Sequence, residues 1–482
     1  MIEIKPNEFY MEDHPKEECG VFGIYGNSHA AELTYLGLFA LQHRGEESAG
    51  IVSNEGEELR TIRGLGLVSD VFTPENLKEL KGESAIGHVR YSTTGSTLLK
   101  NAQPQVVEYS RGHLAVAHNG NITNARHLRD ELEAYGSIFS STVDSEIIIH
   151  LMAKPTYRTR EESLAGSLNR LEGAFSLVML TESEMIGVRD PHGFRPLVLG
   201  KLDNAWVLAS ETCALDLIGA KIEREIESGE VIIINKEGIH SFYPFTEKPK
   251  ALAHCIFEHV YFARPDSDIF GQNVGQVRER LGVELAKEHP VDADIVIPVP
   301  DSGNFAALGY ARQSGIPMAS GIMRNHYIGR TFINPSQSIR EFNVRIKLNP
   351  IKAVLQGKRV IVVDDSIVRG NTAKYRVKSI REAGAKEVHL RISCPPIRFP
   401  CYFGIDFPDP AELIANSKSV EQIQKFLGVD SLGYMSKEGF MRAVNQNVKA
   451  KNDHCTACFF GEYPIKVHDV MDKFSMERKK RI

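Results

Sequence analysis

The sequence KRVIVVDDSIVRGNT, residues Lys358–Thr372, decides how the second half of this chain folds. Val360–Val363 is a short, apolar, β-branched run, which is typical of a strand buried on both faces of a parallel sheet. Two carboxylates, Asp364 and Asp365, end this run, and a loop of small residues leads into a helical pattern that starts at Thr372. The stretch therefore predicts a strand, a loop and a helix within an α/β domain.

The predicted loop lies at the carboxyl end of its strand, where open α/β sheets bind ligands. Its N–H groups and the start of the helix suit a phosphate monoester, and the two carboxylates suit vicinal hydroxyls or a hydrated Mg²⁺. No Gly-Lys-Ser/Thr sequence follows Gly370, so the loop is not a Walker A loop. Together these features predict a site for a ribose 5-phosphate, and a capped strand–turn–helix with two solvated aspartates is the plainer alternative.

Length and composition bound the class of protein. The chain has 482 residues, so we expect two or three domains. Its 62 acidic and 57 basic residues give a net charge of −5, which argues against a nucleic-acid-binding surface. No apolar run approaches the roughly 20 residues that cross a bilayer, and the acidic N-terminus lacks the apolar core of a secretory signal. Seven cysteines without an export signal indicate reduced thiols in a cytoplasmic protein, used for catalysis or metal binding.

The composition changes abruptly at Cys19. Residues 1–18 carry six acidic and two basic side chains, whereas Cys19–Tyr25 is an apolar run typical of a buried strand. A nucleophile at the head of a strand, behind a polar leader, suggests that the leader is removed. The freed α-amine, with a pKa near 7.7–8.0, could then act as the general base for its own side chain. A buried structural cysteine is the alternative.

Further along the first half, polar residues stand at the ends of predicted elements. Arg90 ends one strand, Asn119 and Gly120 follow another, and Asp144 precedes a helix. Arg90 can hold the α-carboxylate of a bound glutamine and Asp144 its α-ammonium. The Asn119 amide and the Gly120 N–H can form an oxyanion hole. Taken singly, an Asn-Gly pair is usually a turn, and an arginine at a strand end is usually solvated.

In this order after the run CGVFGI, these residues resemble the glutamine amidotransferase domain of the N-terminal-nucleophile class. The resemblance implies a four-layer αββα sandwich over residues 19–250. It also implies autocleavage between Glu18 and Cys19, which removes residues 1–18 as a propeptide. Cys19 would attack the side-chain amide of glutamine and release ammonia. The site residues that the resemblance supports are Cys19, Arg90, Asn119, Gly120 and Asp144.

A second predicted strand, 294–298, opens into the turn Val299–Gly303, whose N–H groups can approach a pyrophosphate and whose Ser302 hydroxyl can join a metal shell. Residues 358–372 resemble the phosphoribosylpyrophosphate (PRPP) motif of type I phosphoribosyltransferases. This implies a parallel-sheet domain with C-terminal helices over residues 251–470, and one Mg²⁺ per subunit held at Ser302, Asp364 and Asp365. The implied PRPP contacts are Asp364, Asp365, Ser366, Arg369, Gly370, Asn371 and Thr372.

The pair Cys455 and Cys458 forms a CxxC motif, which alone could be redox-active, zinc-binding or part of an iron–sulfur site. Two further thiolates are needed for a four-cysteine site, and spacing cannot choose among Cys213, Cys255, Cys394 and Cys401. The resemblance implies one [4Fe–4S] cluster per subunit, with zinc as the alternative metal. The cysteines that it assigns to the cluster are Cys255, Cys401, Cys455 and Cys458.

Three remaining segments have simpler interpretations. Residues 323–348 mix basic and apolar side chains, which suits a mobile lid over PRPP, although a solvated basic loop is the alternative. From Ala411 to about Gln446 the pattern is helical, and we expect it to pack on the outside of the second domain. Residues 471–482 are expected to form a solvated basic tail.

Across nearly the whole chain the sequence resembles the glutamine PRPP amidotransferases. The resemblance implies that ammonia from glutamine passes internally to PRPP and gives 5-phosphoribosylamine, at the first committed step of purine synthesis. It also implies a homotetramer and feedback inhibition by purine nucleotides. Two alternatives are a regulatory protein that binds PRPP without catalysis and an amidotransferase with another ammonia acceptor. The intact glutaminase set disfavours the first alternative, and the PRPP motif disfavours the second.

Overall fold

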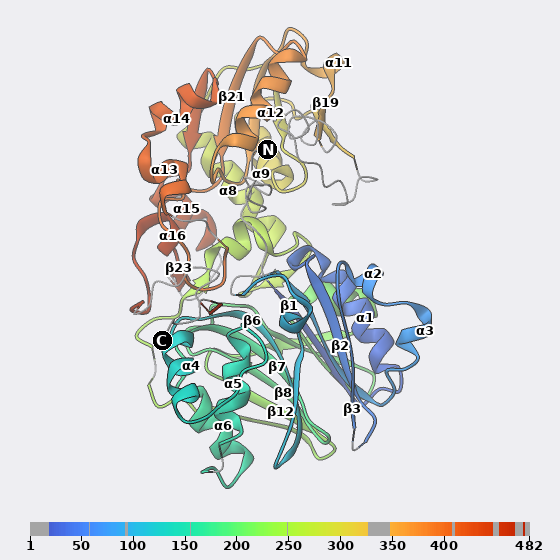
Figure 1. Ribbon diagram of the computed structural model, residues 1–482. Coiled ribbons are helices and arrows are strands. Elements are labelled where there is room, and N and C mark those ends of the chain that lie inside the picture. The colour runs from blue at the N-terminus through green and yellow to red at the C-terminus, as the bar shows by residue number, and fades with distance from the viewer. Residues whose placement is uncertain are drawn as a thin grey trace, which may run out of the picture.

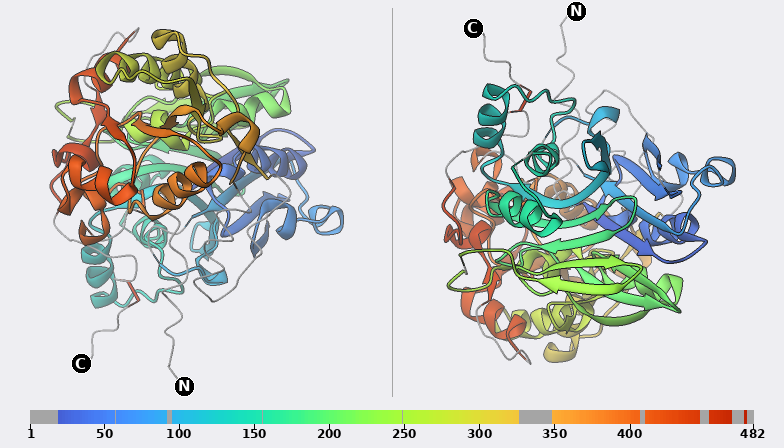
Figure 2. Two further views of the ribbon diagram at one scale, coloured as in Figure 1. Left: turned by 90° about the horizontal axis from the view of Figure 1, so that it is seen from above. Right: turned by 90° about the horizontal axis from the view of Figure 1, so that it is seen from below.

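The computed structural model describes residues 19–56, 58–91, 95–154, 156–247, 249–325, 348–406, 410–446, 453–467 and 476–477. These residues form two stacked units, an N-terminal one drawn from blue to green and a C-terminal one drawn from yellow to red (Figure 1). The views from above and from below show the same stacking (Figure 2). The predicted propeptide and residues 326–347 of the predicted lid lie outside the described residues.

Two antiparallel sheets build the N-terminal unit. The first has the strand order β11-β9-β10-β1-β4-β2-β3, and the second has the order β13-β12-β8-β7-β6-β5. The first sheet consists of β1 (Gly20–Tyr25), β2 (Ser48–Asn54), β3 (Leu59–Leu65), β4 (Ser84–Arg90), β9 (Val198–Leu202), β10 (Ala205–Ala209) and β11 (Lys221–Glu225). The second consists of β5 (Gln105–Tyr109), β6 (Gly112–Ile122), β7 (Gly173–Leu180), β8 (Met185–Arg189), β12 (Val231–Asn235) and β13 (Gly238–Phe242).

Helices cover the outer face of each sheet. On the first sheet they are α1 (Ala30–Ala40), α2 (Val68–Val71), α3 (Pro74–Leu77) and α7 (Thr212–Ile218), with the short turns η2 (Gln42–Arg44) and η3 (Leu99–Asn101) nearby. On the second they are α4 (Ala125–Ala134), α5 (Ser145–Met152) and α6 (Arg160–Leu168). Strand side chains alternate between faces, so Val21 enters the core between the sheets and Phe22 packs under α1. The predicted four-layer αββα sandwich is confirmed.

The C-terminal unit is organised around a parallel sheet with the order β17-β20-β21-β22. Its strands are β17 (Ile295–Pro298), β20 (Arg359–Asp364), β21 (Glu387–Ile392) and β22 (Ser431–Tyr434). Its helices are α8 (Val274–Glu288), α9 (Asn304–Ser314), α11 (Lys352–Leu355), α12 (Asn371–Glu382), α13 (Ile414–Ser417), η5 (Pro410–Glu412), α14 (Val420–Leu427), α15 (Lys437–Val444) and α16 (Ala457–Phe460). Val360–Val363 is buried inside β20, as predicted.

Short elements lie around the junction of the two units. They are the parallel pair β14 (His254–Cys255) and β23 (His454–Cys455), the π-helical turn η4 (Glu258–Phe262), the pair β15 (Asp268–Ile269) and β16 (Gln272–Asn273), and the pair β18 (Ile322–Arg324) and β19 (Leu348–Pro350). The predicted boundary at residue 250 falls between the end of β13 and the start of β14. In Figure 1 the label of β23 stands at the level where the two units meet.

Two local expectations are wrong. The segment 411–446 is not helical throughout, because Ser431–Tyr434 forms β22, the edge strand of the parallel sheet. This strand has four residues, one of them glycine, so it carries little β-propensity. The strand predicted to end before Asn119 continues to Ile122, which places Asn119 and Gly120 inside β6.

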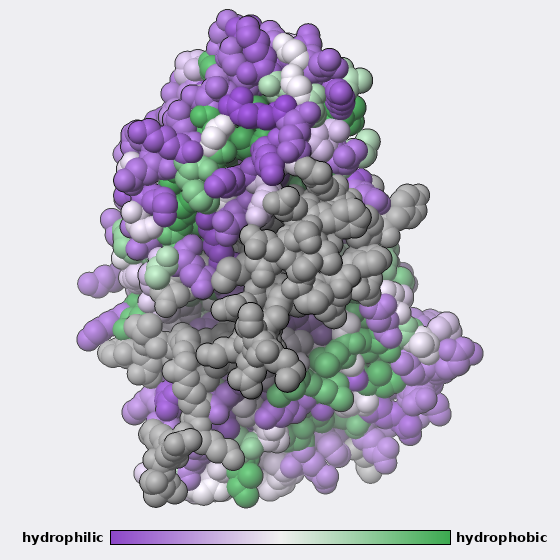
Figure 3. All heavy atoms as spheres, turned by 45° about the horizontal axis from the view of Figure 1, so that its top comes forward, coloured by the Kyte–Doolittle hydropathy of each residue, from purple (hydrophilic) through white to green (hydrophobic). Residues whose placement is uncertain are grey.

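The surface agrees with the composition. Hydrophilic side chains cover much of the face shown in Figure 3, with smaller apolar areas among them. No helix in the described part of the chain is long and apolar enough to cross a membrane.

Candidate active sites

The first candidate site surrounds Cys19, at the head of β1. Its thiol donates a hydrogen bond to the carbonyl of Tyr91 at 3.3 Å, and the residue is buried. Burial raises the pKa of this thiol to about 11, although the nearby charge of Arg90 acts in the opposite direction. The thiol is therefore protonated at neutral pH and needs a base before it can act as a nucleophile.

Arg90 and Asp144 lie in the same electrostatic environment as Cys19. The buried Arg90 guanidinium donates to the carbonyls of Gly95 at 3.2 Å and Ser96 at 3.3 Å. Asp144 accepts a hydrogen bond from the Ile122 N–H at 2.9 Å. Burial raises the pKa of this carboxyl, but His118 and two backbone N–H groups outweigh that effect and hold it below its usual value. An ionised carboxylate and a guanidinium beside one thiol can bind the two charged ends of an amino acid.

The two residues predicted to form an oxyanion hole lie on β6. Asn119 is fully buried, and neither its amide oxygen nor its amide nitrogen has a hydrogen-bond partner among the described residues. Buried polar atoms are rarely left without a partner, so such a group points to a ligand. Gly120 has a φ of +141°, and a Cβ there would stand 2.0 Å from the Ala174 carbonyl oxygen. Only glycine fits at this position.

A residue from the other end of the chain reaches the same site. The Glu477 carboxylate accepts a hydrogen bond from the Ser96 N–H at 2.7 Å, and its charge acts on Arg90. Met476 is buried in the core under the second sheet. The expectation of a solvated tail is therefore wrong for these two residues. A lone methionine and glutamate in a basic tail gave no pattern that could have predicted this contact.

The second candidate site lies at the end of β20. Asp364 and Asp365 are buried, and the Asp365 N–H donates to Asp364 at 3.1 Å. Burial and the neighbouring Asp364 raise the pKa of Asp365, whose side chain also contacts the hydroxyls of Ser366 and Ser302. The predicted magnesium ligands are thus brought together from two strands. The oxygen Oδ1 of Asp365 has no hydrogen-bond partner within the described ranges, so this donor set fits an oxygen-seeking cation.

One partner of these carboxylates was not predicted. Arg376, on α12, forms a buried ion pair with Asp364. Asp364 is therefore not one of two solvated aspartates, and that alternative interpretation is wrong. The helical periodicity placed Arg376 on α12 but could not show which strand its side chain would face.

The loop between β20 and α12 has the geometry expected of an anion site. Gly370 precedes α12 with a φ of +83°, and a Cβ there would stand 2.8 Å from Cδ1 of Ile414. Ser366 to Gly370 thus bring the chain round to the N-terminus of a twelve-residue helix, where the helix dipole favours negative charge. Arg369 at the end of this loop forms an ion pair with Glu412, with 2.8 Å between its Nε and the carboxylate.

The turn after β17 lies near the same edge of the sheet. The Gly303 N–H donates to the Val299 carbonyl at 2.9 Å, and a Cβ on Gly303 would stand 2.4 Å from the Val363 carbonyl oxygen. Glycine thus permits the turn to pack against the end of β20. Asp301 in this turn forms an exposed ion pair with Arg324 at 2.5 Å.

The four predicted cluster cysteines converge from distant parts of the sequence. Cys255 and Cys455 are register partners of β14 and β23. Burial raises the pKa of the Cys458 thiol. The neighbouring thiols raise it further, and they belong to Cys401, Cys455, Cys255 and Cys394. Cys213 lies apart, in the core of the N-terminal unit.

In the described part of the chain, no group of three or more His, Cys, Asp or Glu side chains is arranged to hold one metal ion. The four cysteines carry the thiolate donors that either a [4Fe–4S] cluster or a zinc ion takes. Cys394 is fully buried and lies close to the charges of Asp365 and Asp364.

The loop that follows Cys401 contacts β6, the strand that carries Asn119 and Gly120. The Asn121 amide donates to the Tyr402 carbonyl at 2.9 Å, and Arg195 donates to the Phe403 carbonyl at 2.5 Å. A Cβ on Gly404 would stand 3.1 Å from the carbonyl carbon of Gly120. The C-terminal unit thus forms part of the wall behind Gly120.

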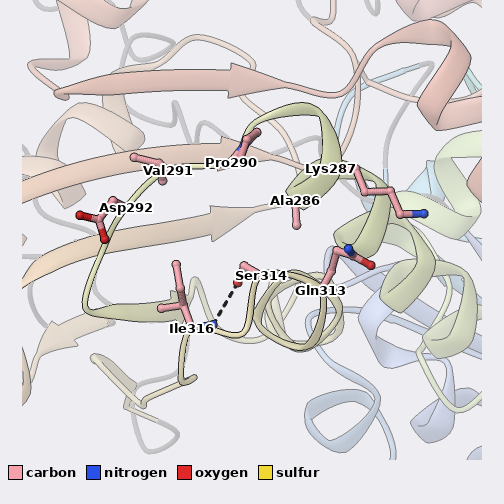
Figure 4. Close-up of a pocket in the computed structure, with 8 residues that line it drawn as sticks. All are labelled: Ala286, Lys287, Pro290, Val291, Asp292, Gln313, Ser314 and Ile316. Carbon is pink, nitrogen blue, oxygen red and sulfur yellow. Dashed lines mark hydrogen bonds between the residues drawn. The ribbon is translucent and has the colours of Figure 1, made fainter.

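A separate hollow of about 540 Å³ lies between the ends of α8 and α9 (Figure 4). Pro290, Asp292 and Ile316 are among its lining residues, and the Ile316 N–H donates to the Ser314 hydroxyl at 3.3 Å. None of the predicted site residues lines it, so we assign it no part in the chemistry.

The fold and the two sites define a class of protein: a glutamine amidotransferase joined to a phosphoribosyltransferase-type domain. The sequence profile of the glutamine amidotransferase domain family matches residues 88–217. Amidophosphoribosyltransferase 1, chloroplastic, of Arabidopsis thaliana is 52% identical over 466 residues, which cover 96% of this chain and 81% of that protein. Amidophosphoribosyltransferase of Bacillus subtilis is 47% identical over 454 residues, covering 94% and 95%.

Solved structures agree with these sequence comparisons. The glutamine PRPP amidotransferase from B. subtilis complexed with ADP and GMP superposes with a TM-score of 0.90 and 46% identity, over 95% of this chain and all of that one. A structure described as the allosteric regulatory enzyme of purine biosynthesis gives a TM-score of 0.91 at 46% identity, over 96% and 99%. The chain belongs to the amidophosphoribosyltransferase family.

Proposed function

We propose that the chain hydrolyses glutamine at Cys19 and delivers the ammonia to PRPP at Asp364 and Asp365, which yields 5-phosphoribosylamine, glutamate and pyrophosphate. The observation that carries the assignment of the first half-reaction is the buried Asn119 amide, which has no partner within the described residues and lies on β6, a strand that contacts β1. Membership of the family supports the overall reaction at the first committed step of purine synthesis.

In the glutaminase step, the Cys19 sulfur gives up its proton and attacks the side-chain carbonyl carbon of glutamine. The Asn119 amide and the Gly120 N–H stabilise the resulting oxyanion. The carbon–nitrogen bond then breaks, the nitrogen takes up the proton, and ammonia leaves. Water hydrolyses the remaining thioester to glutamate. Arg90 and Asp144 hold the α-carboxylate and the α-ammonium during these steps.

In the transfer step, the nitrogen lone pair of ammonia forms a bond to C1 of the ribose while the bond from C1 to the pyrophosphate oxygen breaks. The loop from Ser366 to Thr372 binds the 5-phosphate, and the turn at Ser302 approaches the pyrophosphate. Asp364, Asp365 and Ser302 would hold one Mg²⁺, which supplies charge neutralisation to the leaving pyrophosphate.

Two features of maturation belong to the proposal. Removal of residues 1–18 would free the α-amine of Cys19, and a protonated thiol in a buried site supports the need for such a base. Cys255, Cys401, Cys455 and Cys458 would hold one [4Fe–4S] cluster per subunit, which would fasten the C-terminal segment to the junction. The mutual approach of these four thiols supports that assignment.

Regulation and assembly complete the proposal. One structural relative binds ADP and GMP, which supports control of this chain by purine nucleotides. We also propose a homotetramer, which is what the resemblance of the sequence to the glutamine PRPP amidotransferases implies.

The experiment that tests the proposal compares glutamine with ammonium as the nitrogen source. Cys19→Ser should lose glutamine-dependent synthesis and retain ammonium-dependent synthesis of phosphoribosylamine. Asp365→Asn should lose synthesis from both nitrogen sources. If Cys19→Ser lost both activities while remaining folded, or if Asp365→Asn retained synthesis, the assignment of the two half-reactions to the two units would be wrong.

A further inference from the structure

Four charged side chains with no solvent exposure meet between the two units. They form what we call the junction ion cluster, which consists of Arg44, Arg195, Glu211 and Glu258. The Arg44 guanidinium donates hydrogen bonds to both carboxylate oxygens of Glu258, at 2.7 and 2.9 Å, and to Glu211 at 2.6 Å. Arg195 lies 3.5 Å from Glu258. The two positive and two negative charges balance, as buried charges require.

Glu258 comes from the other side of the junction. Arg44 ends the turn η2 and Glu211 precedes α7, so both belong to the N-terminal unit. Glu258 begins η4, and its neighbours Phe257 and Val260 are part of the apolar core of the C-terminal unit. A carboxylate anchored in the C-terminal unit thus supplies the bidentate partner of an arginine in the N-terminal unit.

Arg44 connects this partner to the nucleophile. Its Nε donates a hydrogen bond to the backbone carbonyl of Cys19 at 3.0 Å, while its two terminal nitrogens bind Glu258 and Glu211. A guanidinium is planar, and its donors have a fixed geometry. The orientation that Glu258 imposes on the terminal nitrogens therefore also sets the direction of Nε. The carbonyl that Nε holds is attached to the Cα that carries the Cys19 thiol.

The turn η4 also contacts the framework of the second site. Arg278, on α8, donates to the carbonyls of His259 and Ala263 at 2.8 Å each. Burial lowers the pKa of Arg278 to about 10, and the Asp365 carboxylate opposes that decrease. The turn η4 thus contacts both Arg44, which binds the Cys19 carbonyl, and Arg278, which lies close to the Asp365 carboxylate.

We propose that Glu258 is a positioning residue for the glutaminase: it orients Arg44, which fixes the backbone of Cys19, so the first site is complete only when the C-terminal unit is in place. This inference rests on the proposed function of Cys19. Glu258 touches neither glutamine nor the reacting atoms, so its effect falls on the rate of attack. Binding of glutamine depends on Arg90 and Asp144, which the junction ion cluster leaves in place.

The test measures kcat and KM for glutamine hydrolysis, and ammonium-dependent synthesis, in Glu258→Gln and Arg44→Lys. Glu258→Gln keeps the shape of the side chain and removes its charge. Arg44→Lys keeps the charge but replaces the planar guanidinium with an ammonium. Because misplacing a reacting group by about 1 Å can cost about 100-fold, we expect kcat for glutamine hydrolysis to fall about 10- to 100-fold in both. The KM for glutamine and the ammonium-dependent rate should stay within about twofold. Labelling of Cys19 by a diazoketone analogue of glutamine should slow in parallel with kcat.

Glu284→Gln is the matched control, because Glu284 is a glutamate of α8 that pairs with the exposed Arg442 of α15, within the C-terminal unit. An unchanged kcat for glutamine hydrolysis in Glu258→Gln would overturn the proposal. So would an equal fall in ammonium-dependent synthesis, which would show that Glu258 supports the fold of the C-terminal unit. If Glu258→Gln did not fold, Arg44→Lys would decide by the same criteria. Failure of the proposed function is distinguishable, because Cys19→Ser would then still hydrolyse glutamine.

Discussion

Cys255 and Cys455 lie opposite each other as register partners of two parallel two-residue strands. Only the meeting of the junction segment with the C-terminal segment creates this pair, and the CxxC motif supplies Cys458 to the same place. Cys401 approaches from the loop that touches the oxyanion strand. Four thiols from three segments thus form one candidate cluster site, whose ligands can be tested one by one.

Protein purified without air should contain about four irons and four sulfides per chain. Cys401→Ser should lower the iron content and bleach the visible absorption, because it removes one cluster ligand. Cys394→Ala is the matched control, since Cys394 lies near the Cys458 thiol but is not assigned to the cluster. Loss of iron from Cys394→Ala with retention in Cys401→Ser would contradict the ligand assignment, and stoichiometric zinc would contradict the cluster itself.

Asn119→Ala should lower kcat for glutamine hydrolysis by about 100- to 1,000-fold, because one oxyanion donor contributes about 2.7–4 kcal/mol. The KM for glutamine should change little, since Arg90 and Asp144 remain. Steady-state kinetics of glutamine hydrolysis measure both values. Asn169→Ala, at the exposed end of α6, serves as the control for a lost asparagine. A variant in which only KM changed would show that Asn119 binds the ground state instead.

Gly370→Ala should raise the KM for PRPP and destabilise the fold. The positive φ costs about 1–2 kcal/mol for a residue other than glycine, and the added Cβ also meets Ile414 at 2.8 Å. Gly357→Ala is a close control, because Gly357 has a φ of +72° with nothing within 4 Å of the added Cβ. Denaturant titration and PRPP saturation curves should therefore show a larger effect at Gly370. Equal effects at the two glycines would mean that the contact between residue 370 and Ile414 contributes neither to stability nor to PRPP binding.

Glu477→Gln should lower the KM for glutamine. The Glu477 carboxylate accepts a hydrogen bond from the Ser96 N–H, and its negative charge acts on Arg90. It therefore competes with the α-carboxylate of glutamine for the positive charge of Arg90. Saturation curves at low and high salt measure the effect, which should shrink as salt screens the charge. Glu462→Gln removes an exposed carboxylate near Lys437 and should leave KM unchanged. An increase in KM would show that Glu477 assists glutamine binding.

Acid should destabilise the protein partly through His88. Burial lowers the pKa of His88 to about 3, well below its value near 6.5 in the unfolded chain, and the ring contacts the His118 carbonyl at 2.9 Å. Between about pH 3 and pH 6.5 the unfolded state therefore binds more protons than the folded state. The stability that neutral His88 supports is complete above pH 6.5 and is lost as the pH falls, by about 2 kcal/mol at pH 5.

Denaturant titrations of the wild type and His88→Gln at pH 7 and pH 5 test this contribution. The wild type should lose about 2 kcal/mol more than the variant over this interval, because glutamine does not titrate. Equal losses would show that His88 is already protonated in the folded protein at pH 5.

The sequence predicted elements whose patterns are local. The apolar run before Asp364 marked β20, and the helical pattern that starts at Thr372 marked α12, which begins at Asn371. It did not predict β22, because four residues with a glycine carry little periodicity. Contacts such as Arg376 with Asp364, or Glu477 with Ser96, depend on how distant segments pack, and no local pattern encodes them.

The approach of Gly404 to Gly120 limits how this gene can change. A side chain at Gly404 would press on Gly120, to which we assign one donor of the oxyanion hole, although the two positions lie in different units. Recombination that exchanged the second half for a distant relative's would alter a wall of the first active site. We therefore expect that a gene divided near codon 250 would encode two products that need each other to be complete.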